Sequence, residues 1–226
     1  MIDRSGRSGV RDYTIHVIGR RWLNERIFEL RFDRPPGFDF QPGQKIGFRF
    51  QAATWDYTLL GPTHGPELSI CVRHLPEGRF SPRLAAAAPG EPFQIGAASG
   101  FFTFKPSPQP AVLVATGTGV APFVAFARAG VRGFDLLHGV RAAEDLVYGR
   151  ELAAAARTYR PCLSGPLPAT GAPEFFAGRV DACLTQRLSP GMYDFYLCGN
   201  GDMIRDVMRL IDERFPDSRV FTETFF

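Results

Sequence analysis

The stretch at residues 112–122 constrains the fold of this chain more than any other. Its first residues, Val112 to Ala115, are all apolar and include two β-branched valines, which is typical of a buried parallel strand. The apolar run breaks at Gly117-Thr118-Gly119 and resumes around Pro122, a residue that suits the first turn of a helix. The pattern predicts a strand, a glycine turn and a helix whose free N–H groups point at the turn.

The start of such a helix is a favourable place for a phosphate or pyrophosphate, because unpaired N–H groups and the helix dipole attract anions. The third glycine of the G-x-G-x-x-G fingerprint is absent, so a tight turn that binds nothing is an alternative interpretation. Residues 106–127 carry no charge, but Gly117, Gly119 and Pro122 interrupt the middle of this stretch. This interruption argues against a membrane span.

Composition indicates a packed protein of one large or two small domains, with 226 residues, 45% of them hydrophobic and 22% charged. The four cysteines form no C-x-x-C pair, which argues against a structural zinc or iron–sulfur site. The first residues are polar and basic, so we expect a cytoplasmic protein without a signal peptide. Basic residues exceed acidic ones in the first half, which favours an acidic partner, whereas no basic run with interleaved aromatics supports nucleic-acid binding.

The first half of the chain has the pattern of an antiparallel β-barrel. Short alternating segments at residues 13–18, 27–32, 45–50, 68–73 and 92–95 are separated by proline and glycine turns. Residues 81–88 are expected to form a short helix. Three prolines within residues 105–110 predict a stiff linker. We therefore expect a tail at 1–10, a barrel domain at 11–105, a linker at 106–110 and a second domain at 111–226.

The second domain alternates strands and helices, as in a parallel sheet with right-handed crossovers. The predicted strands lie at residues 112–115, 134–139, 160–163, 194–198 and 220–226. The predicted helices lie at residues 122–129, 143–157, 180–188 and 202–214. The expected fold class is an N-terminal antiparallel β-barrel followed by a C-terminal α/β domain with a parallel sheet.

Six short motifs occur in order along the chain. They are Pro42-Gly43-Gln44, Tyr57-Thr58, Gly78-Arg79-Phe80-Ser81 leading into Pro82-Arg83-Leu84, residues 117–122, Cys198-Gly199-Asn200 and residues 223–226. With these motifs the chain resembles the ferredoxin–NADP reductase family, and it is most similar to the bacterial ferredoxin/flavodoxin reductases. The resemblance implies a flavoenzyme that holds FAD on the barrel and takes NADPH or NADH as its substrate on the α/β domain.

The resemblance also implies which residues contact the flavin. Tyr57 would pack on the isoalloxazine, Phe225 would cover the opposite face, and residues 78–81 would meet the pyrophosphate. Phe226 would reach toward the adenine. The complete set of expected FAD contacts is Trp55, Asp56, Tyr57, Thr58, Cys71, Val72, Gly78, Arg79, Phe80, Ser81, Phe225 and Phe226.

The same resemblance implies the nucleotide contacts and the chemistry. Cys198 and Glu223 would lie near the nicotinamide and Thr58 near flavin N5, which makes these three the expected catalytic residues. The expected NAD(P) contacts are Gly117, Thr118, Gly119, Arg141, Ser164, Arg179, Cys198 and Gly199. No metal ligands are expected. Each motif by itself also fits a plain structural role, such as a half-buried strand pair at Tyr57 and Thr58 or a small buried side chain at Cys198.

Two departures from the family pattern affect ligand binding. Trp55 stands where the family has an arginine that pairs with a flavin phosphate, and Arg79 or Arg83 is a candidate to compensate. Gly165 follows Ser164 where the bacterial NADP-specific members have an arginine. The loss of one bidentate arginine weakens the case for NADP, so NADPH and NADH both stay open.

The function implied is hydride transfer from NAD(P)H to FAD, followed by single-electron transfer to ferredoxin or flavodoxin. One alternative is the reductase component of an oxygenase, or a reductase of free flavin or ferric complexes. An alternative of another class is a flavin-binding electron-transfer or sensor subunit without its own NAD(P)H activity.

Overall fold

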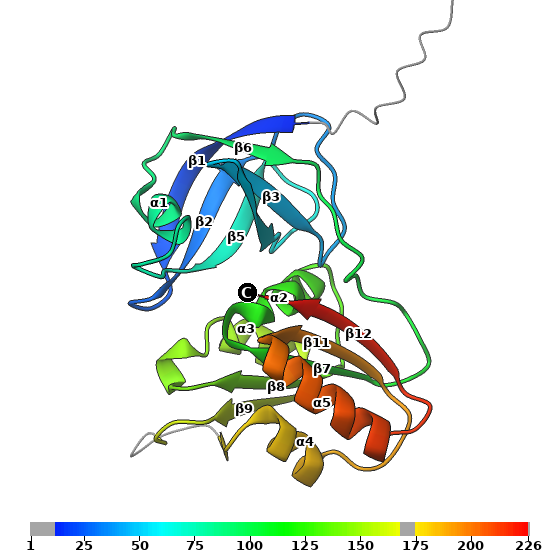
Figure 1. Cartoon of the computed structure of the whole chain (residues 1–226). Coiled ribbons are helices and arrows are strands. Elements are labelled where there is room, and N and C mark those ends of the chain that lie inside the picture. Colours follow the sequence, from blue (N-terminus) through cyan, green and yellow to red (C-terminus); the bar gives the residue numbers. More distant parts are fainter. Residues whose placement is uncertain (1–11, 168–174, 226) are drawn as a thin grey trace, which may run out of the picture.

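A computed structural model describes residues 12–167 and 175–225, and these form two six-stranded sheets that follow one another along the chain (Figure 1). The first sheet is antiparallel, with strand order β4-β3-β6-β1-β2-β5. The second is parallel, with strand order β10-β9-β8-β7-β11-β12. The expected fold class is confirmed. The carboxyl end of β12 lies between the two sheets.

The first sheet curls like a barrel without closing. Its edge strands β4 and β5 share no ladder within the described residues, and Leu59, just after β4, bridges to Ile70 of β5. Phenylalanines fill its interior, among them the fully buried Phe32, Phe48 and Phe80. The strands are β1 (Asp12–Trp22), β2 (Ile27–Asp33), β3 (Lys45–Phe50), β4 (Ala53–Thr58), β5 (Glu67–Arg73) and β6 (Pro92–Gly96), with the short helix α1 (Ser81–Ala86) before β6.

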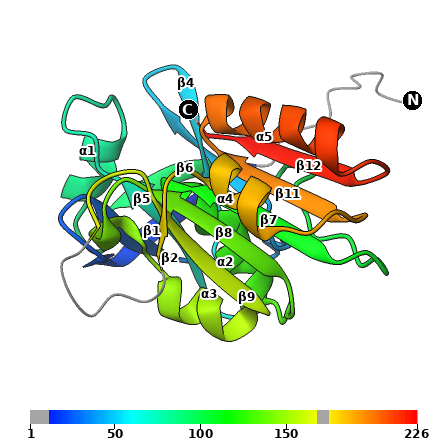
Figure 2. The same ribbon diagram turned by 90° about the horizontal axis from the view of Figure 1, so that it is seen from below.

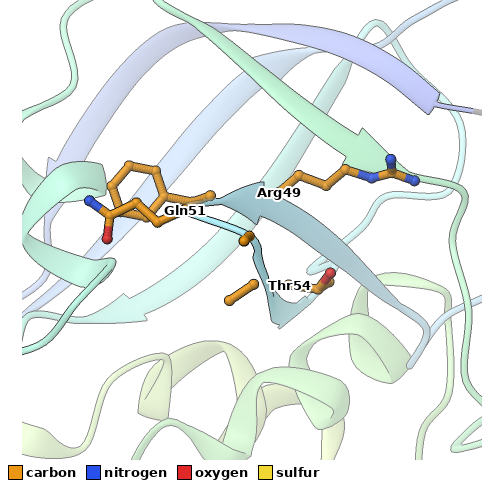
Figure 3. Close-up of a pocket in the computed structure, with 6 residues that line it drawn as sticks. Arg49, Gln51 and Thr54 are labelled. Carbon is orange, nitrogen blue, oxygen red and sulfur yellow. The ribbon is translucent and has the colours of Figure 1, made fainter.

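Strand β4 was not predicted, because its residues show no clear alternation of apolar and polar side chains. The turn that joins it to β3 has positive φ at Gln51 (48°) and at Ala52 (59°). Figure 3 shows this hairpin end, where residues 49–54 line a shallow hollow of about 400 Å³. Arg49 and Gln51 extend to opposite sides of it, and the hollow gathers no cluster of ionisable groups.

Helices cover both faces of the second sheet (Figure 2). Helices α2 (Ala121–Arg128) and α3 (Gly149–Ala155) pack on the face turned toward the barrel, and α4 (Val180–Arg187) and α5 (Gly201–Arg214) on the other. The remaining elements are β7 (Ala111–Thr116), η1 (Gly117–Val120), β8 (Asp135–Val140), η2 (Ala143–Asp145), β9 (Thr158–Leu163), β10 (Phe176–Ala177), β11 (Asp194–Gly199) and β12 (Arg219–Thr224). No helix in the described part of the chain is long and apolar enough to cross a membrane.

Two further details differ from the sequence-based expectation. The helix expected at 143–157 is interrupted, because Tyr148 adopts a left-handed conformation with φ 60° between η2 and α3. This conformation places the Tyr148 hydroxyl against Glu29 of the barrel, to which it donates a hydrogen bond of 3.1 Å. The two-residue strand β10 was also missed, since two residues carry no periodicity.

Candidate functional site

A cavity of about 620 Å³ opens between the two sheets and is lined by both. It collects most of the residues predicted for the site: Trp55, Asp56, Tyr57, Thr58, Cys71, Gly78, Arg79, Phe80, Ser81, Gly117, Thr118, Gly119, Gly199, Glu223 and Phe225. Of the other predicted residues, Val72, Cys198, Arg141, Ser164 and Arg179 do not line it. Phe226 lies outside the described residues.

Aromatic rings form the barrel side of the cavity. Trp55 stacks on Phe80 with ring centroids 6.0 Å apart and planes 21° apart, and Tyr57 lies 6.2 Å from the same ring. Burial raises the pKa of Tyr57 to about 12, so its hydroxyl stays neutral at physiological pH. Thr58 follows with only 3% of its surface exposed. These side chains offer an aromatic, largely apolar wall on which a planar aromatic ligand can pack.

Cationic side chains without protein partners also line the cavity. Arg73 and Arg79 form no ion pair within residues 12–167 and 175–225. Arg83 does not reach the cavity, because it pairs with Glu91 and lies over the Phe93 ring. Of the two arginines named as candidates to compensate for the missing family arginine, only Arg79 therefore lines the cavity. Arg73, which was not predicted, lines it as well.

The groups of the cavity fit a flavin that carries phosphates. The indole Nε1 of Trp55 is buried without a hydrogen-bond acceptor, a condition that costs about 1–3 kcal/mol. The hydroxyl of Ser81 is already engaged, since it accepts the Leu75 N–H at 3.0 Å and donates to the Leu75 carbonyl at 3.3 Å. Ser81 thus holds the 75–81 turn in shape and leaves the arginines as the charged groups for phosphates.

The glycine turn forms the opposite wall. Gly117 has φ 53°, a conformation that side chains rarely adopt. Gly119 is buried so closely against β11 that a Cβ would lie 2.4 Å from the carbonyl oxygen of Cys198. His138 of β8 contacts the turn through Nε2, which lies 3.2 Å from the Gly117 carbonyl oxygen. Its Nδ1 lies 3.1 Å from the Tyr159 hydroxyl. The predicted strand, turn and helix are present, with η1 inserted between the strand and α2.

The two walls meet in a cluster of three charged groups. Lys45 Nζ lies 3.0 Å from Asp56 Oδ2 within the barrel and 3.1 Å from Glu223 Oε1 on β12. Burial lowers the pKa of Lys45, but its hydrogen bonds to Asp56 and Glu223 outweigh this effect and raise the pKa above the usual value. Lys45 was missed because its role depends on a contact between residues 178 positions apart.

Cys198 lies behind this cluster and its side chain is fully buried. Burial, and next the charge of Glu223, raise the pKa of its thiol well above the usual value, so the thiol is neutral. Strand pairing sets Cys198 beside Glu223, and the Phe225 N–H donates to the Gly199 carbonyl at 2.9 Å. Phe225, half-buried, therefore extends the β11–β12 ladder by one residue into the cavity.

The remaining predicted nucleotide contacts lie at the carboxyl ends of neighbouring strands. Arg141 follows β8, Ser164 follows β9, and Arg179 comes just before α4. Gly165 packs against the Arg141 backbone, where a Cβ would lie 2.3 Å from the carbonyl oxygen. An arginine at position 165 would therefore require the backbone to move.

Comparison with known proteins agrees with this architecture. The family described as "Oxidoreductase NAD-binding domain" matches residues 113–209. The flavodoxin/ferredoxin–NADP reductase of Escherichia coli (strain K12) is 28% identical over 212 residues, which cover 80% of this chain and 82% of that protein. The toluate 1,2-dioxygenase electron transfer component of Pseudomonas putida is 29% identical over 185 residues, which cover 76% of this chain and 54% of that protein.

A solved structure has the same fold over nearly the whole chain. The ferredoxin NADP+ reductase of Neisseria gonorrhoeae, with bound FAD and NADP, superposes with a TM-score of 0.78 at 20% identity. The match covers 95% of this chain and 99% of that one. The order of the two sheets, the glycine turn and the matches along the sequence lead to one assignment: the chain is similar to the ferredoxin–NADP reductases and is an NAD(P)H-dependent flavoenzyme oxidoreductase.

Proposed function

We propose that this protein binds FAD on the barrel-like sheet, oxidises NAD(P)H on the α/β sheet and passes single electrons to ferredoxin or flavodoxin. The observation that carries the proposal is the cavity itself, because one space is lined by the aromatic wall of the barrel and by the glycine turn. Hydride transfer requires two rings at close range, and a cavity between two binding sheets meets that requirement. We also propose that residues 11–105 and 111–226 are the two domains, joined by a linker at 106–110.

FAD supplies the hydride acceptor and the means to release electrons one at a time. Tyr57 and Phe225, which line the cavity from different sheets, would flank the isoalloxazine. Arg73 and Arg79 would neutralise phosphate charge. Trp55, which stands where the family has an arginine, would donate its N–H to an acceptor on the cofactor but would supply no charge. Thr58 would position its hydroxyl at the reacting edge of the flavin.

NAD(P)H would bind with its pyrophosphate on the N–H groups of residues 117–120. Arg73 would help from the barrel side, since its guanidinium lies 4.0 Å from the position of a Cβ on Gly117. The nicotinamide would displace Phe225 to reach the flavin, so this residue acts as a gate. Oxidation of the nicotinamide gives the ring a positive charge, which the Glu223 carboxylate would stabilise, while the buried, neutral Cys198 would support Glu223 from the neighbouring strand.

The acceptor is the second part of the proposal. The Escherichia coli relative, named for flavodoxin and ferredoxin, supports a small electron-transfer protein as the acceptor. A second candidate is the oxygenase system, because the Pseudomonas putida relative is the electron transfer component of a dioxygenase. The two candidates share the NAD(P)H half-reaction and differ only in the protein that receives the electrons.

Anaerobic mixing tests the proposed function. The protein is expected to release FAD, not FMN, on heating, and its flavin absorbance should bleach when NADH or NADPH is added without oxygen. Reoxidation by purified ferredoxin or flavodoxin then tests the acceptor. A flavin that neither nucleotide bleaches would show a non-catalytic electron-transfer or sensor subunit instead. Recovery of FMN alone would contradict the assignment of the cofactor.

A further inference from the structure

The topology of the second sheet determines where the far half of the nucleotide lies, given the proposed function, on which this inference rests. The glycine turn follows β7, and the cavity extends from it toward β11 and β12. The nicotinamide end therefore occupies the β11 side, and the adenosine end extends the other way, over the carboxyl ends of β8 and β9. Arg141, Ser164 and Arg179 are the described polar side chains expected at that end.

Arg179 is already held by two carboxylates. Its Nη2 lies 3.5 Å from Asp206 Oδ2 on α5, and its Nε lies 3.9 Å from Asp181 Oδ1 on α4. The two helices pack side by side on one face of the sheet (Figure 2). Asp181 Oδ1 is buried and accepts no hydrogen bond within the described residues, so Arg179 is its nearest compensating charge. Release of Arg179 would leave both carboxylates uncompensated.

Ser164 and Gly165 add no charge for a phosphate. The hydroxyl of Ser164 donates to the Val140 carbonyl at 3.3 Å, and the Gly165 N–H donates to the Arg141 carbonyl at 3.0 Å. Because a Cβ on Gly165 would lie 2.3 Å from that carbonyl oxygen, the backbone excludes a long cationic side chain there. Arg141 is then the one described cation of this set that is not paired with a carboxylate.

We propose that Asp181 and Asp206 determine specificity for NADH, because they hold Arg179 away from the ribose and repel a 2′-phosphate. A phosphate monoester carries about −1.5 to −2 charges at neutral pH, and here it would meet two carboxylates that share a single guanidinium. The ribose hydroxyl of NADH carries no charge and can donate to a carboxylate. The discrimination thus arises from charge at the adenosine end, far from the reacting ring.

The test compares NADH and NADPH as reductants of the holoprotein and removes the two charges. The wild type is expected to show at least about tenfold higher kcat/KM with NADH, a difference of about 1.4 kcal/mol. Asp181→Asn combined with Asp206→Asn should lower the NADH-to-NADPH ratio about tenfold or more, through the KM for NADPH. Asp212→Asn is the matched control, since it removes the same charge from an exposed position on α5. If the double variant does not fold, Asp206→Asn alone serves, because that side chain is 42% exposed.

Calorimetric titration with 5′-AMP and 2′,5′-ADP provides a readout that does not depend on hydride transfer. The wild type should bind 5′-AMP at least as tightly as 2′,5′-ADP, and the aspartate variants should gain affinity only for 2′,5′-ADP. Wild-type preference for NADPH, or a ratio that moves no more than in Asp212→Asn, would overturn the inference. Failure of both nucleotides to bleach the flavin would overturn the proposed function, and the titration would still decide the inference.

Discussion

At the scale of single residues, the site depends on buried polar groups that are held neutral. His138 is the clearest case, since it has no exposed surface and both ring nitrogens have partners. Burial lowers its pKa to about 4, an effect only partly offset by the bond to Gly117 and the charge of Asp145. The neutral ring donates from Nε2 to the Gly117 carbonyl and accepts from Tyr159 at Nδ1, so it fixes the glycine turn.

Stability is therefore expected to fall in acid through His138. The folded-state pKa lies below the unfolded value of about 6.5, so the unfolded chain takes up a proton first as the pH falls. The stabilisation that depends on a neutral His138 is fully present above about pH 6.5. As the pH falls from there to about 4, the free energy of unfolding decreases by about 1.4 kcal/mol per pH unit. Urea unfolding at pH 5 and 7 measures it.

Two variants separate this effect from general acid sensitivity. His138→Gln should unfold with a smaller dependence on pH, because glutamine can donate to Gly117 but does not titrate in this range. His64→Gln, on an exposed loop, should retain the wild-type dependence. An equal pH dependence in all three proteins would contradict the assignment to His138.

At the scale of elements, the glycine turn is determined by close packing of two backbones. Gly119 lies against the Cys198 carbonyl, and Gly117 needs positive φ. The turn can therefore approach β11 only where no side chain intervenes. Its N–H groups are held at the cavity because Asn200 N donates to Thr116 Oγ1 at 3.0 Å and ties the starts of η1 and α5 together.

Gly119→Ala is expected to disrupt nucleotide binding more than flavin binding. The added Cβ would lie 2.4 Å from a backbone oxygen that cannot turn aside, so β11 and the turn must separate. We expect a loss of about 1–3 kcal/mol in the free energy of unfolding, as for other overpacked sites, and weaker binding of NADH. Gly96→Ala is the control, because nothing lies within 4 Å of its added Cβ. Unchanged NADH affinity in Gly119→Ala would contradict the assigned role of the turn.

At the scale of the whole molecule, polar contacts fix how the two sheets face each other. Tyr148, just before α3, and Arg128, at the end of α2, approach the buried Glu29 of the barrel, at 3.1 and 3.8 Å. Arg26 pairs with Asp145 at 3.0 Å, and Lys45 with Glu223 at 3.1 Å on the cavity side. These contacts join the two halves of the molecule directly, and of their members Lys45 and Glu223 line the cavity.

Lys45→Met should weaken this arrangement. It leaves the Glu223 carboxylate, 13% exposed, without its cation, and we expect a loss of about 1–3 kcal/mol in the free energy of unfolding. The variant should also change the flavin absorption spectrum, since the cluster lines the cavity. Arg31→Met is the matched control, because the Arg31–Glu67 pair is exposed on both sides and lies within one sheet. Equal losses of unfolding free energy in the two variants would show that the Lys45–Glu223 contact stabilises the protein no more than an exposed ion pair within one sheet.

Much of this architecture follows from local sequence. In the first half, apolar and polar residues alternate, which predicted a sheet that buries one face. In the second half, continuous apolar runs that end in glycine turns predicted a sheet that buries both faces. The six motifs predicted most residues of the cavity wall, from Tyr57 to Phe225. These features depend on neighbours along the chain, so the sequence by itself determined them.

The tertiary structure alone decided the contacts between residues far apart in the chain. Lys45 and Arg73 enter the site only because the two sheets face each other, and Arg83 leaves it because Glu91 lies nearby. Arg179 was expected from the sequence as a nucleotide contact, yet its charge is shared with Asp181 and Asp206 from two helices. The physical reason is that charge and close packing act through space, and no local pattern specifies which distant group will occupy the neighbouring position.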